Sequence, residues 1–341
     1  MLIRVNADTP DQARTARQAG IPGIGLCCTE ALLLDPELRR WMHRVAGTAE
    51  EGERREALSK VLPLHQSDLE AIFAAISPYP AFVRLIDPPL QNFLPTLEQI
   101  NDHATDALSD EDWEQWQALT GLRQRLSALS TANPVLGNRG CRLSVTHPEI
   151  MTMQVTAILQ ACIAVEKSGI RTAPAIVIPL VATEEETRVL VERVRSIASE
   201  VFLRHGQQVD YRVGVLIELP RAALCAGAIA RHVDFVAFGT NDLTQMTFGF
   251  SREESSVYLQ TYLEQGIFKE DPFIKLDIAG VGQLLTLAIR DIHSQRPEME
   301  IGVCGDHCDD DNALRFFQSL DVDWISCPLT CIEKLKQTIE V

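Results

Sequence analysis

Acidic side chains stand directly after two neighbouring apolar runs of the sequence. Glu218 follows the run VGVLI, and Asp242 follows the segment FGTN. Two carboxylates that approach each other can share a hard divalent cation, which takes oxygen ligands and keeps several waters for substrate oxygens to replace. The pattern therefore favours a metal site at Glu218 and Asp242. The competing interpretation is that each carboxylate forms a structural ion pair with a nearby arginine.

Arginines lie in two other segments that are predicted to be strands. Arg84 lies in FVRLI and Arg139 lies in GNRGCR, and each presents a planar fork that suits phosphate or carboxylate. We predict that both bind substrate and that Arg84 also takes part in catalysis. The alternative is that they close salt bridges at the end of a barrel, for example with Asp87. Arg142 is assigned a structural role.

A cysteine offers an acid or base for proton transfer at carbon. Cys304 ends an apolar run, between Val303 and Gly305. A thiol whose pKa is near 8 to 9 can give or take a proton near neutral pH, so we predict a catalytic role for Cys304. The alternative is a small buried apolar residue, as expected for most cysteines of the chain. Zinc at CGDHC (304–308) is disfavoured because no second Cys/His pair has a standard spacing.

The elements that must position these residues are short apolar runs, each followed by a segment with helical periodicity. Runs that are apolar at every position are typical of strands covered on both faces, so the sheet should be parallel. The seven apolar runs given at the end of this paragraph, together with a short strand near 137–142, make eight predicted strands. LIRVNA (2–7) is taken as an extra leading strand. Alternation of strand and helix at this count predicts an α/β fold, a (β/α)8 TIM barrel with helical insertions, whose active site lies at the C-terminal ends of the strands. The seven other runs are GIGLC (23–27), FVRLI (82–86), AIVIPLV (175–181), VGVLIEL (213–219), DFVAFG (234–239), IGVCG (301–305) and VDWISC (322–327).

Helix starts and insertions can also be read from the sequence. Thr146 with Glu149, and Thr183 with Glu186, fit the capping box that satisfies the free amides of a first helical turn. Helical excursions from the barrel are expected at about 35–64 and 102–129. No stretch rich in Gly, Ser or Pro separates two parts, so residues 1–341 are predicted to form a single domain.

Charge and composition exclude several classes of protein. The chain has 341 residues, with 31 Lys and Arg against 47 Asp and Glu, and the net charge of −16 repels nucleic acid and anionic lipid. The N-terminus has no signal-peptide core, and the longest strongly apolar stretch, 175–182, is too short to cross a bilayer. Nine cysteines at irregular spacing indicate reduced thiols, so we predict a cytoplasmic protein without a nucleic-acid or membrane partner.

Long motifs in the chain resemble a known family. In order along the sequence, they resemble the C-terminal phosphoenolpyruvate (PEP)/pyruvate-binding barrel of pyruvate, phosphate dikinase. PEP synthase and the sugar-phosphotransferase enzyme I share this barrel, but DPPLQNFLP and MTFGFSR are more similar to the dikinase. The motifs are GIGLCCTEALLL (23–34), VRLIDPPLQNFLP (83–95), NPVLGNRGCRLSVTHPEI (133–150), IELPRAAL (217–224), FGTNDLTQMTFGFSR (238–252), DPFIKLD (271–277), GVGQL (280–284) and CGDH (304–307).

The resemblance implies a role for each matching position. In the family, two carboxylates that match Glu218 and Asp242 hold Mg2+, for which Mn2+ is an alternative. Arginines that match Arg84 and Arg139 bind the phosphoryl group and the enolate oxygen. The family's proton donor to the methylene carbon matches Cys304. The family also tends to form dimers through this barrel, so a homodimer is expected.

Two further substrate-binding positions follow from the resemblance, and one of them departs from the family. Asn241 matches an asparagine that contacts the substrate. The family motif GLCRTEH reads GLCCTEA here, so Cys28 stands where an arginine grips the phosphoryl group and Ala31 stands where a histidine is found. Loss of that guanidinium removes a charge-assisted hydrogen bond worth about 1.5–3 kcal/mol. Three smaller departures also follow from the resemblance. This chain has Asn138 where the family has histidine, Ala237 where it has serine and Asp306 where it has glutamate.

Three functions are consistent with this pattern. The first is a phosphotransferase that interconverts pyruvate and PEP, with phosphate supplied by a separate phosphohistidine protein, because none of the eight histidines lies in the family's GGxxSH-type motif. The second is a Mg2+-dependent lyase or aldolase that forms a pyruvate-type enolate from a 2-oxo acid. The third is a catalytically weak binding or regulatory subunit. In each case, the small-molecule partner is a 2-oxo acid or its enol phosphate.

Overall fold

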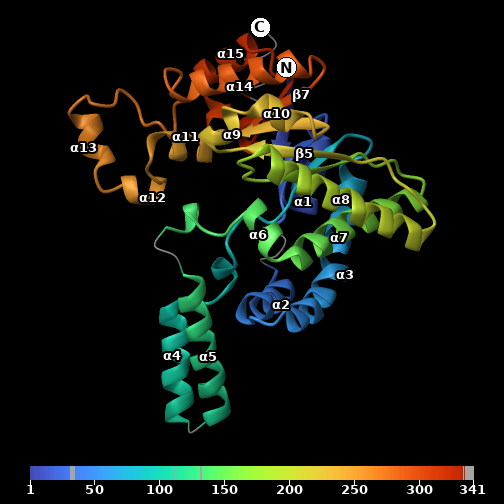
Figure 1. The fold of residues 1–341 in the computed structure, drawn as a ribbon, viewed down its shortest axis with the longest axis vertical. Coiled ribbons are helices and arrows are strands. Elements are labelled where there is room, and N and C mark those ends of the chain that lie inside the picture. The colour runs from blue at the N-terminus through green and yellow to red at the C-terminus, as the bar shows by residue number, and fades with distance from the viewer. Residues whose placement is uncertain (31–34, 111, 131–132, 333, 335–341) are drawn as a thin grey trace.

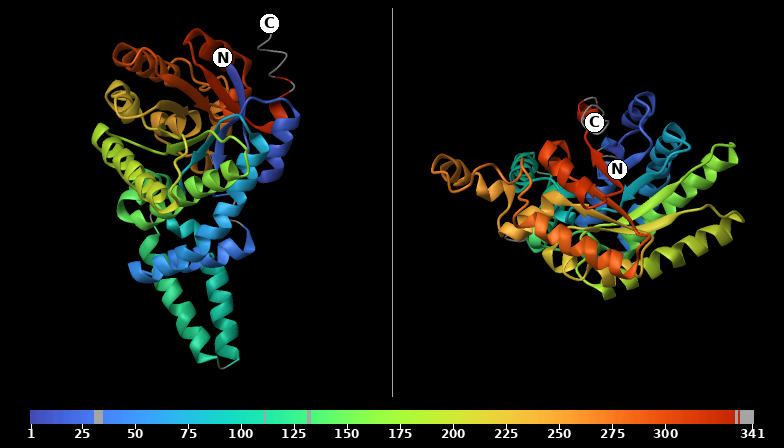
Figure 2. Two further views of the ribbon diagram at one scale, coloured as in Figure 1. Left: turned by 90° about the vertical axis from the view of Figure 1, so that its right-hand side faces the viewer. Right: turned by 90° about the horizontal axis from the view of Figure 1, so that it is seen from above.

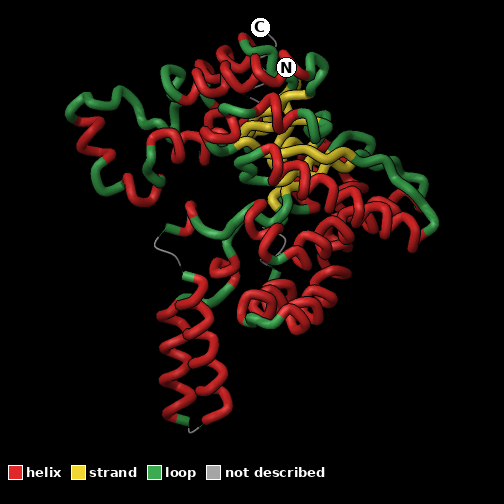
Figure 3. Tube along the Cα trace, in the orientation of Figure 1, coloured by secondary structure: helices red, strands yellow, loops and turns green. Residues whose placement is uncertain are grey.

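Parallel strands that are buried on both faces form the centre of the fold. The computed structural model describes residues 1–30, 35–110, 112–130, 133–332 and 334, and in these residues eight strands close into a barrel in sequence order (Figures 1 and 3). β1 pairs with β8 to close it. The predicted α/β barrel is therefore confirmed. The strands are β1 (Leu2–Asn6), β2 (Ile24–Cys28), β3 (Ala81–Arg84), β4 (Pro174–Ile178), β5 (Arg212–Ile217), β6 (Phe235–Gly239), β7 (Glu300–Cys304) and β8 (Trp324–Cys327).

The predicted strand count is right, but one strand was misplaced. Residues 2–6 are not an extra strand, because β1 belongs to the barrel and pairs with both β2 and β8. Residues 137–142 are not a strand: a loop leads to helix α6, which begins at Cys141. Arg142 donates hydrogen bonds to the carbonyls of Leu136 and Gly137, and Gly140 has φ +56°. These contacts fold the loop back on itself and keep it out of the sheet, and they agree with the structural role expected for Arg142.

Side chains of different size fill the two ends of the barrel interior. At the N-terminal end, the rings of Phe82, Phe235 and Trp324 pack together, with ring centroids 4.8 Å and 4.6 Å apart around Phe82. Toward the C-terminal end, the same interior cluster contains the small side chains of Ala237 and Cys304. Large rings thus fill one end, and small side chains are part of the packing toward the other.

Helices surround the barrel and cover the outer faces of the strands (Figures 1 and 2). Thr183 caps α8 with the predicted box, whereas the box at Thr146 is wrong. Thr146 is the last residue of α6, and α7 begins at Pro148 after His147. The helices are α1 (Pro10–Gln18), α2 (Pro36–Gly47), α3 (Glu51–Ile76), α4 (Leu97–Ser109), α5 (Trp113–Leu129), α6 (Cys141–Thr146), α7 (Pro148–Lys167), α8 (Glu184–His205), α9 (Pro220–Ala223), α10 (Ala226–Ala230), α11 (Thr240–Phe248), α12 (Arg252–Ser255), α13 (Leu259–Glu264), α14 (Val281–Gln295) and α15 (Asp311–Ser319).

One helix is more apolar than the sequence analysis recognised. Among the described residues, α7 alone is long and apolar enough to cross a membrane, and 78% of its apolar window is buried inside the protein. It packs against α3 and α8. Packing onto the barrel therefore accounts for its apolar composition.

Three segments project from the barrel or extend its shell. The excursion expected at 35–64 corresponds to α2 and the first half of α3, which continues to Ile76 as a barrel helix. The one expected at 102–129 is the hairpin of α4 and α5, which begins at Leu97 and extends away from the barrel (Figure 1). A further excursion, residues 249–280 with α12 and α13, was not anticipated and is called the arm below. The single-domain organisation stays a prediction.

Candidate active site

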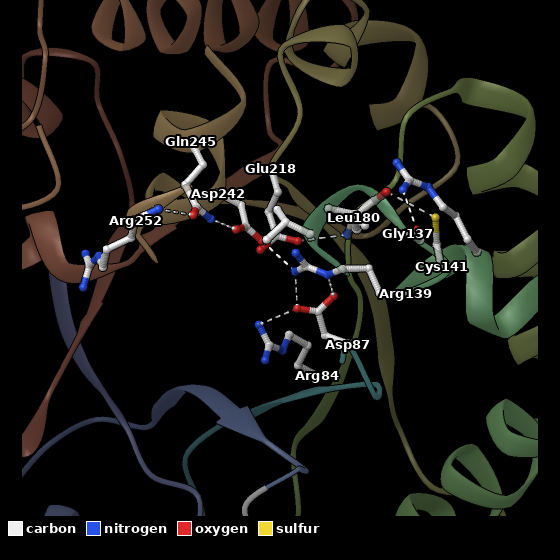
Figure 4. A network of polar contacts seen from close by, with 12 residues as sticks. Arg84, Asp87, Gly137, Arg139, Cys141, Leu180, Glu218, Asp242, Gln245 and Arg252 are labelled. Atoms are coloured by element: carbon white, nitrogen blue, oxygen red, sulfur yellow. Dashed lines mark hydrogen bonds and ion pairs between the residues drawn. The ribbon is translucent and has the colours of Figure 1, made fainter. Parts of the chain in front are cut away.

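Polar side chains from five strand ends meet at the C-terminal end of the barrel. Figure 4 shows those at the ends of β3, β5 and β6. This is the end at which barrels of this type carry their active sites. Most of the residues singled out in the sequence lie in one network of ion pairs and hydrogen bonds. The residues that the network or its immediate surroundings bring together are Cys28, Arg84, Asp87, Arg139, Glu218, Asn241, Asp242 and Cys304.

Arg139 joins two carboxylates in this network. Its Nε and Nη2 donate to Asp87, with distances of 3.1 Å to Oδ1 and 2.5 Å to Oδ2. The same Nη2 donates to Oδ2 of Asp242 at 2.7 Å. The Arg139 side chain is 10% exposed, so these pairs lie largely away from water. The ion pairs that were the alternative interpretation of the arginines are thus formed.

Arg84 lies on the other side of Asp87. Its Nη1 is 3.5 Å from Oδ2 of Asp87, and its Nη2 donates to Oε1 of Glu30 at 3.4 Å. Burial alone would lower the pKa of Arg84, but the surrounding carboxylates, Glu30 first, raise it well above its ordinary value. The buried Nε of Arg84 has no hydrogen-bond partner among the described residues. That N–H group is available to an oxygen atom of a ligand.

Glu218 is held by the backbone of the neighbouring strand end. Its Oε2 accepts a hydrogen bond from the N–H of Leu180 at 3.0 Å, and Leu180 has φ +60°, a left-handed conformation that is costly for leucine. Gly239 provides the space beside it, because a Cβ at that position would lie 2.8 Å from Cγ and Oε1 of Glu218. Backbone strain and a glycine therefore both serve to place this carboxylate.

The charges of the network suit a divalent cation. Four carboxylates and two guanidinium groups leave a net charge of −2 when all of them are ionised. Burial, and then the charges of Asp87 and Asp242, raise the pKa of Glu218 well above its usual range. Within the described residues no three His, Cys, Asp or Glu side chains form a metal cluster, but Mg2+ commonly takes only one or two carboxylates. The donors at Glu218 and Asp242 therefore fit the ion. The charged groups are Glu30, Arg84, Asp87, Arg139, Glu218 and Asp242.

Two thiols lie beside the network in their protonated form. Cys304 is 3% exposed and its Sγ is 3.6 Å from the carbonyl of Phe238. Burial, followed by the negative charge of Glu218, raises the pKa of Cys304 well above its usual value. Burial raises the pKa of Cys28 to about 12. At neutral pH both thiols hold their protons, so Cys304 can serve as a proton donor.

Comparison with known proteins identifies the family. The model of the PEP-binding domain of PEP-utilising enzymes matches residues 1–341. The chain belongs to this family. Pyruvate, phosphate dikinase of Flaveria pringlei is 42% identical over 329 residues, which cover 95% of this chain and 34% of the relative. The enzyme of Rhizobium meliloti is 40% identical over 96% of this chain and 36% of the relative. The family predicted from the motifs is confirmed, and the chain spans about a third of the length of these relatives.

Solved structures also resemble this chain. A HpcH/HpaI aldolase/citrate lyase family protein from Burkholderia cenocepacia superposes with a TM-score of 0.45 and 13% identity, over 99% of this chain and 93% of that one.

Some positions at which the resemblance implies a departure from the family can be located in the structure. Cys28 ends β2 in register with Arg84 of β3, and its N–H donates to Oδ1 of Asp8 at 2.6 Å. Asn138 donates to the hydroxyl of Thr146 at the rim. Two further positions are Ala237, in the barrel interior, and Ala31, which lies outside the described residues.

Asn241 faces the loop that follows β7. Its Oδ1 accepts a hydrogen bond from the N–H of Asp306 at 2.9 Å, and no described residue accepts one from its Nδ2. Asp306, for which the resemblance implies a glutamate in the family, pairs in turn with Arg252 of the arm at 2.7 Å. The amide nitrogen of Asn241 is therefore free to contact a substrate, as the resemblance implies.

Sequence reasoning missed two polar members of the site. Glu30 follows Cys28 by two residues, and it accepts the N–H of Asp87 at 2.7 Å in addition to its contact with Arg84. Gln245 follows Asp242 by one helical turn and donates to its Oδ1 at 2.6 Å. Residues three apart on a helix are neighbours, so the spacing of Asp242 and Gln245 could have predicted their contact. The partners of Glu30 come from another strand, and no local signal reveals them.

Proposed function

We propose that this chain is a Mg2+-dependent, phosphotransferase-type barrel that interconverts pyruvate and PEP through an enolate. The observation that carries the proposal is the pair of carboxylates, buried Glu218 and half-buried Asp242, beside two arginines and a protonated thiol. Phosphate is supplied by a separate phosphohistidine protein. Membership of the PEP-binding family supports the substrate class.

The metal would be held by Glu218 and Asp242, with Mn2+ able to replace Mg2+. When bound, the ion supplies positive charge that stabilises negative charge on the enolate oxygen. Arg139 exchanges its contact with Asp242 for a contact with the incoming anion. Its ion pair with Asp87 is kept during this exchange. Exchange of one charged partner for another keeps the buried guanidinium paired throughout.

Arg84 and Cys304 act on the reacting atoms. The free Nε–H of Arg84 donates to an oxygen atom of the phosphoryl group or the enolate. In the direction from PEP to pyruvate, the phosphoryl group leaves for the partner's histidine and an enolate remains. Cys304 then transfers its thiol proton to C3, which yields pyruvate and a thiolate that regains a proton from solvent. Asn241 orients the substrate through its amide nitrogen.

Cys28 favours a second function, in which no phosphate is handled. A thiol at this position gives a phosphoryl group no guanidinium, whereas the metal, enolate and proton-transfer positions are all retained. A lyase or aldolase that forms the enolate of pyruvate from a 2-oxo acid needs only the retained set. The same residues would then stabilise the enolate after carbon–carbon bond cleavage.

The remaining parts of the proposal come from composition and family resemblance. The chain acts in the cytoplasm on a small 2-oxo acid or enol phosphate, as one domain and as a homodimer. Nucleic acid and membrane are not partners, since the net charge of −16 opposes both.

Two assays test the proposed function. The first mixes the chain with PEP, Mg2+ and the separately expressed histidine-carrying part of the Rhizobium meliloti dikinase, and measures pyruvate. Formation of pyruvate, lost in Cys304→Ala and kept in Cys225→Ala, supports the phosphotransferase. The second follows exchange of the C3 protons of pyruvate in heavy water with Mg2+ and no phosphate donor. Exchange without pyruvate formation from PEP favours the lyase, and metabolite binding with neither activity overturns both in favour of a binding subunit.

A further inference from the structure

Gln245 connects the proposed metal ligand Asp242 to the arm. Its side-chain Nε2 donates to Oδ1 of Asp242 at 2.6 Å, and its Oε1 accepts from the backbone N–H of Arg252 at 2.9 Å. Gln245 lies one turn after Asp242 on α11, and Arg252 is the first residue of α12 (Figure 4). The side-chain amide of Gln245 thus hydrogen-bonds both to the carboxylate of Asp242 and to a backbone N–H group of the arm.

Arg252 closes this chain of contacts into a ring. Its Nη2 donates to Oδ2 of Asp306 at 2.7 Å and to the carbonyl of Phe273 at 3.3 Å. The N–H of Asp306 donates to Oδ1 of Asn241, the residue next to Asp242. The ring therefore joins α11, the arm and the loop after β7. It includes Asn241, which is proposed to contact the substrate, and Asp242, which is proposed to bind the metal.

We propose that Gln245 is a positioning residue for Asp242 in the metal site, and that Arg252 acts through it. This inference rests on the proposed function. A glutamine suits the position because its amide donates to the carboxylate and accepts from the backbone at the same time. An acidic side chain would lack the donor and would repel Asp242.

The hydrogen bond from Gln245 to Asp242 determines which carboxylate oxygen is left to contact Arg139 or a cation. With Oδ1 held by Gln245, Oδ2 is the atom that contacts Arg139, at 2.7 Å. Without Gln245, the carboxylate can rotate about its Cβ–Cγ bond and present both oxygens to the Arg139 fork. A cation would then compete with a two-pronged ion pair instead of a single contact, so its affinity should fall.

The test is Mn2+ binding to the purified chain, measured by electron paramagnetic resonance of the free ion. We expect Gln245→Ala to raise the Mn2+ Kd about tenfold and Arg252→Ala to raise it about threefold, since the Arg252–Asp306 pair is half exposed. The double variant should match Gln245→Ala alone, because effects along one path do not add. The matched control is Gln260→Ala, which removes a similar contact with Glu264 from α13 and should leave the Kd unchanged.

A kinetic readout separates positioning from general damage to the fold. If the proposed activity is present, Gln245→Ala should raise the Mg2+ concentration needed for half-maximal rate and leave the rate at saturating Mg2+ within about threefold. A fall in the saturating rate alone, with an unchanged Mn2+ Kd, overturns the inference.

The outcomes also separate this inference from the proposed function. A wild-type chain that binds no Mn2+ refutes the metal site itself. Binding by the wild type with an unchanged Kd in Gln245→Ala refutes only the positioning role. If Gln245→Ala does not fold, Arg252→Ala decides, and an unchanged Kd in that variant overturns the inference.

Discussion

Nη2 of Arg139 lies 2.5 Å from Oδ2 of Asp87 and 2.7 Å from Oδ2 of Asp242, so one nitrogen serves both carboxylates. The second contact involves an oxygen atom that the proposed metal would use. Asp87 therefore has two effects on the metal site. It draws Arg139 away from Asp242, and it adds negative charge near Glu218.

Asp87→Asn should weaken Mn2+ binding by at least tenfold. The neutral amide removes one negative charge from the network and frees Arg139 to pair fully with Asp242, and both changes oppose a cation. The measurement is a Mn2+ titration beside the wild type, with a thermal melt to verify folding. Unchanged or tighter binding in a folded variant would contradict this account of Asp87.

Gly239→Ala should displace Glu218 and weaken Mn2+ binding about tenfold, with the barrel still folded. The added Cβ would lie 2.8 Å from Cγ and Oε1 of Glu218, which is too close for the side chain to keep its place. The matched control is Gly121→Ala in α5, where a Cβ meets nothing within 4 Å. That control should gain about 0.5–1 kcal/mol of helix stability and bind Mn2+ normally. Equal Mn2+ affinity in both variants would refute this role for Gly239.

Cys28→Arg should strengthen PEP binding about tenfold or more under the phosphotransferase hypothesis. A guanidinium at the end of β2 would stand beside Arg84 and add a charge-assisted hydrogen bond to the phosphoryl group, worth about 1.5–3 kcal/mol. Cys28→Met controls for size without charge and should not improve binding. The measurement is calorimetric titration of PEP in the presence of Mg2+. No gain in Cys28→Arg would count against a phosphate pocket at this position.

His65 should make the stability of the chain depend on pH. This α3 residue is fully buried, neither ring nitrogen has a partner among the described residues, and burial lowers its pKa from 6.5 to about 4. The unfolded state then binds more protons than the folded state between these values, so stability falls as the pH drops through this window. The loss between pH 7 and pH 5 should be about 2 kcal/mol.

Urea unfolding at pH 7 and pH 5 measures the effect of His65. His65→Leu should lose about 2 kcal/mol less stability than the wild type over this range. The control is His103→Gln, at an exposed position of α4, which should follow the wild type. A variant His65→Leu with the wild-type pH dependence would show that another group is responsible.

The barrel and the edge that carries the site were predictable because they depend on local pattern. Strands such as β4 and β5 are apolar at successive positions, and parallel strands place the residues that follow them at one end. β1 was predicted as an extra strand because residues 137–142 were counted as the eighth strand of the barrel, and its sequence contains a charged residue, Arg4. Arg4 is buried nonetheless, since it pairs with Glu300 at 3.1 Å and lies over the rings of Phe82 and Trp324.

Other features of the site depend on partners that are distant in sequence. The alternative roles of Arg139, ion pair or ligand binder, could not be separated from the sequence, and the structure gives it two carboxylate partners that are 52 and 103 residues away. Glu30 was missed for the same reason, because its contacts with Arg84 and Asp87 cross from β2 to the end of β3. The left-handed backbone of Leu180, which orients Glu218, has no sequence signal, since leucine rarely adopts it.

The most direct test of the account is calorimetric titration of Mn2+ into the wild type, Glu218→Gln and Asp242→Asn, with oxalate present as a mimic of the enolate. The account predicts one Mn2+ bound per wild-type chain, tighter with oxalate than without it, and at least tenfold weaker binding in each variant. A wild-type chain that takes up no Mn2+ beside oxalate, or variants that bind the ion as tightly as the wild type, would contradict it.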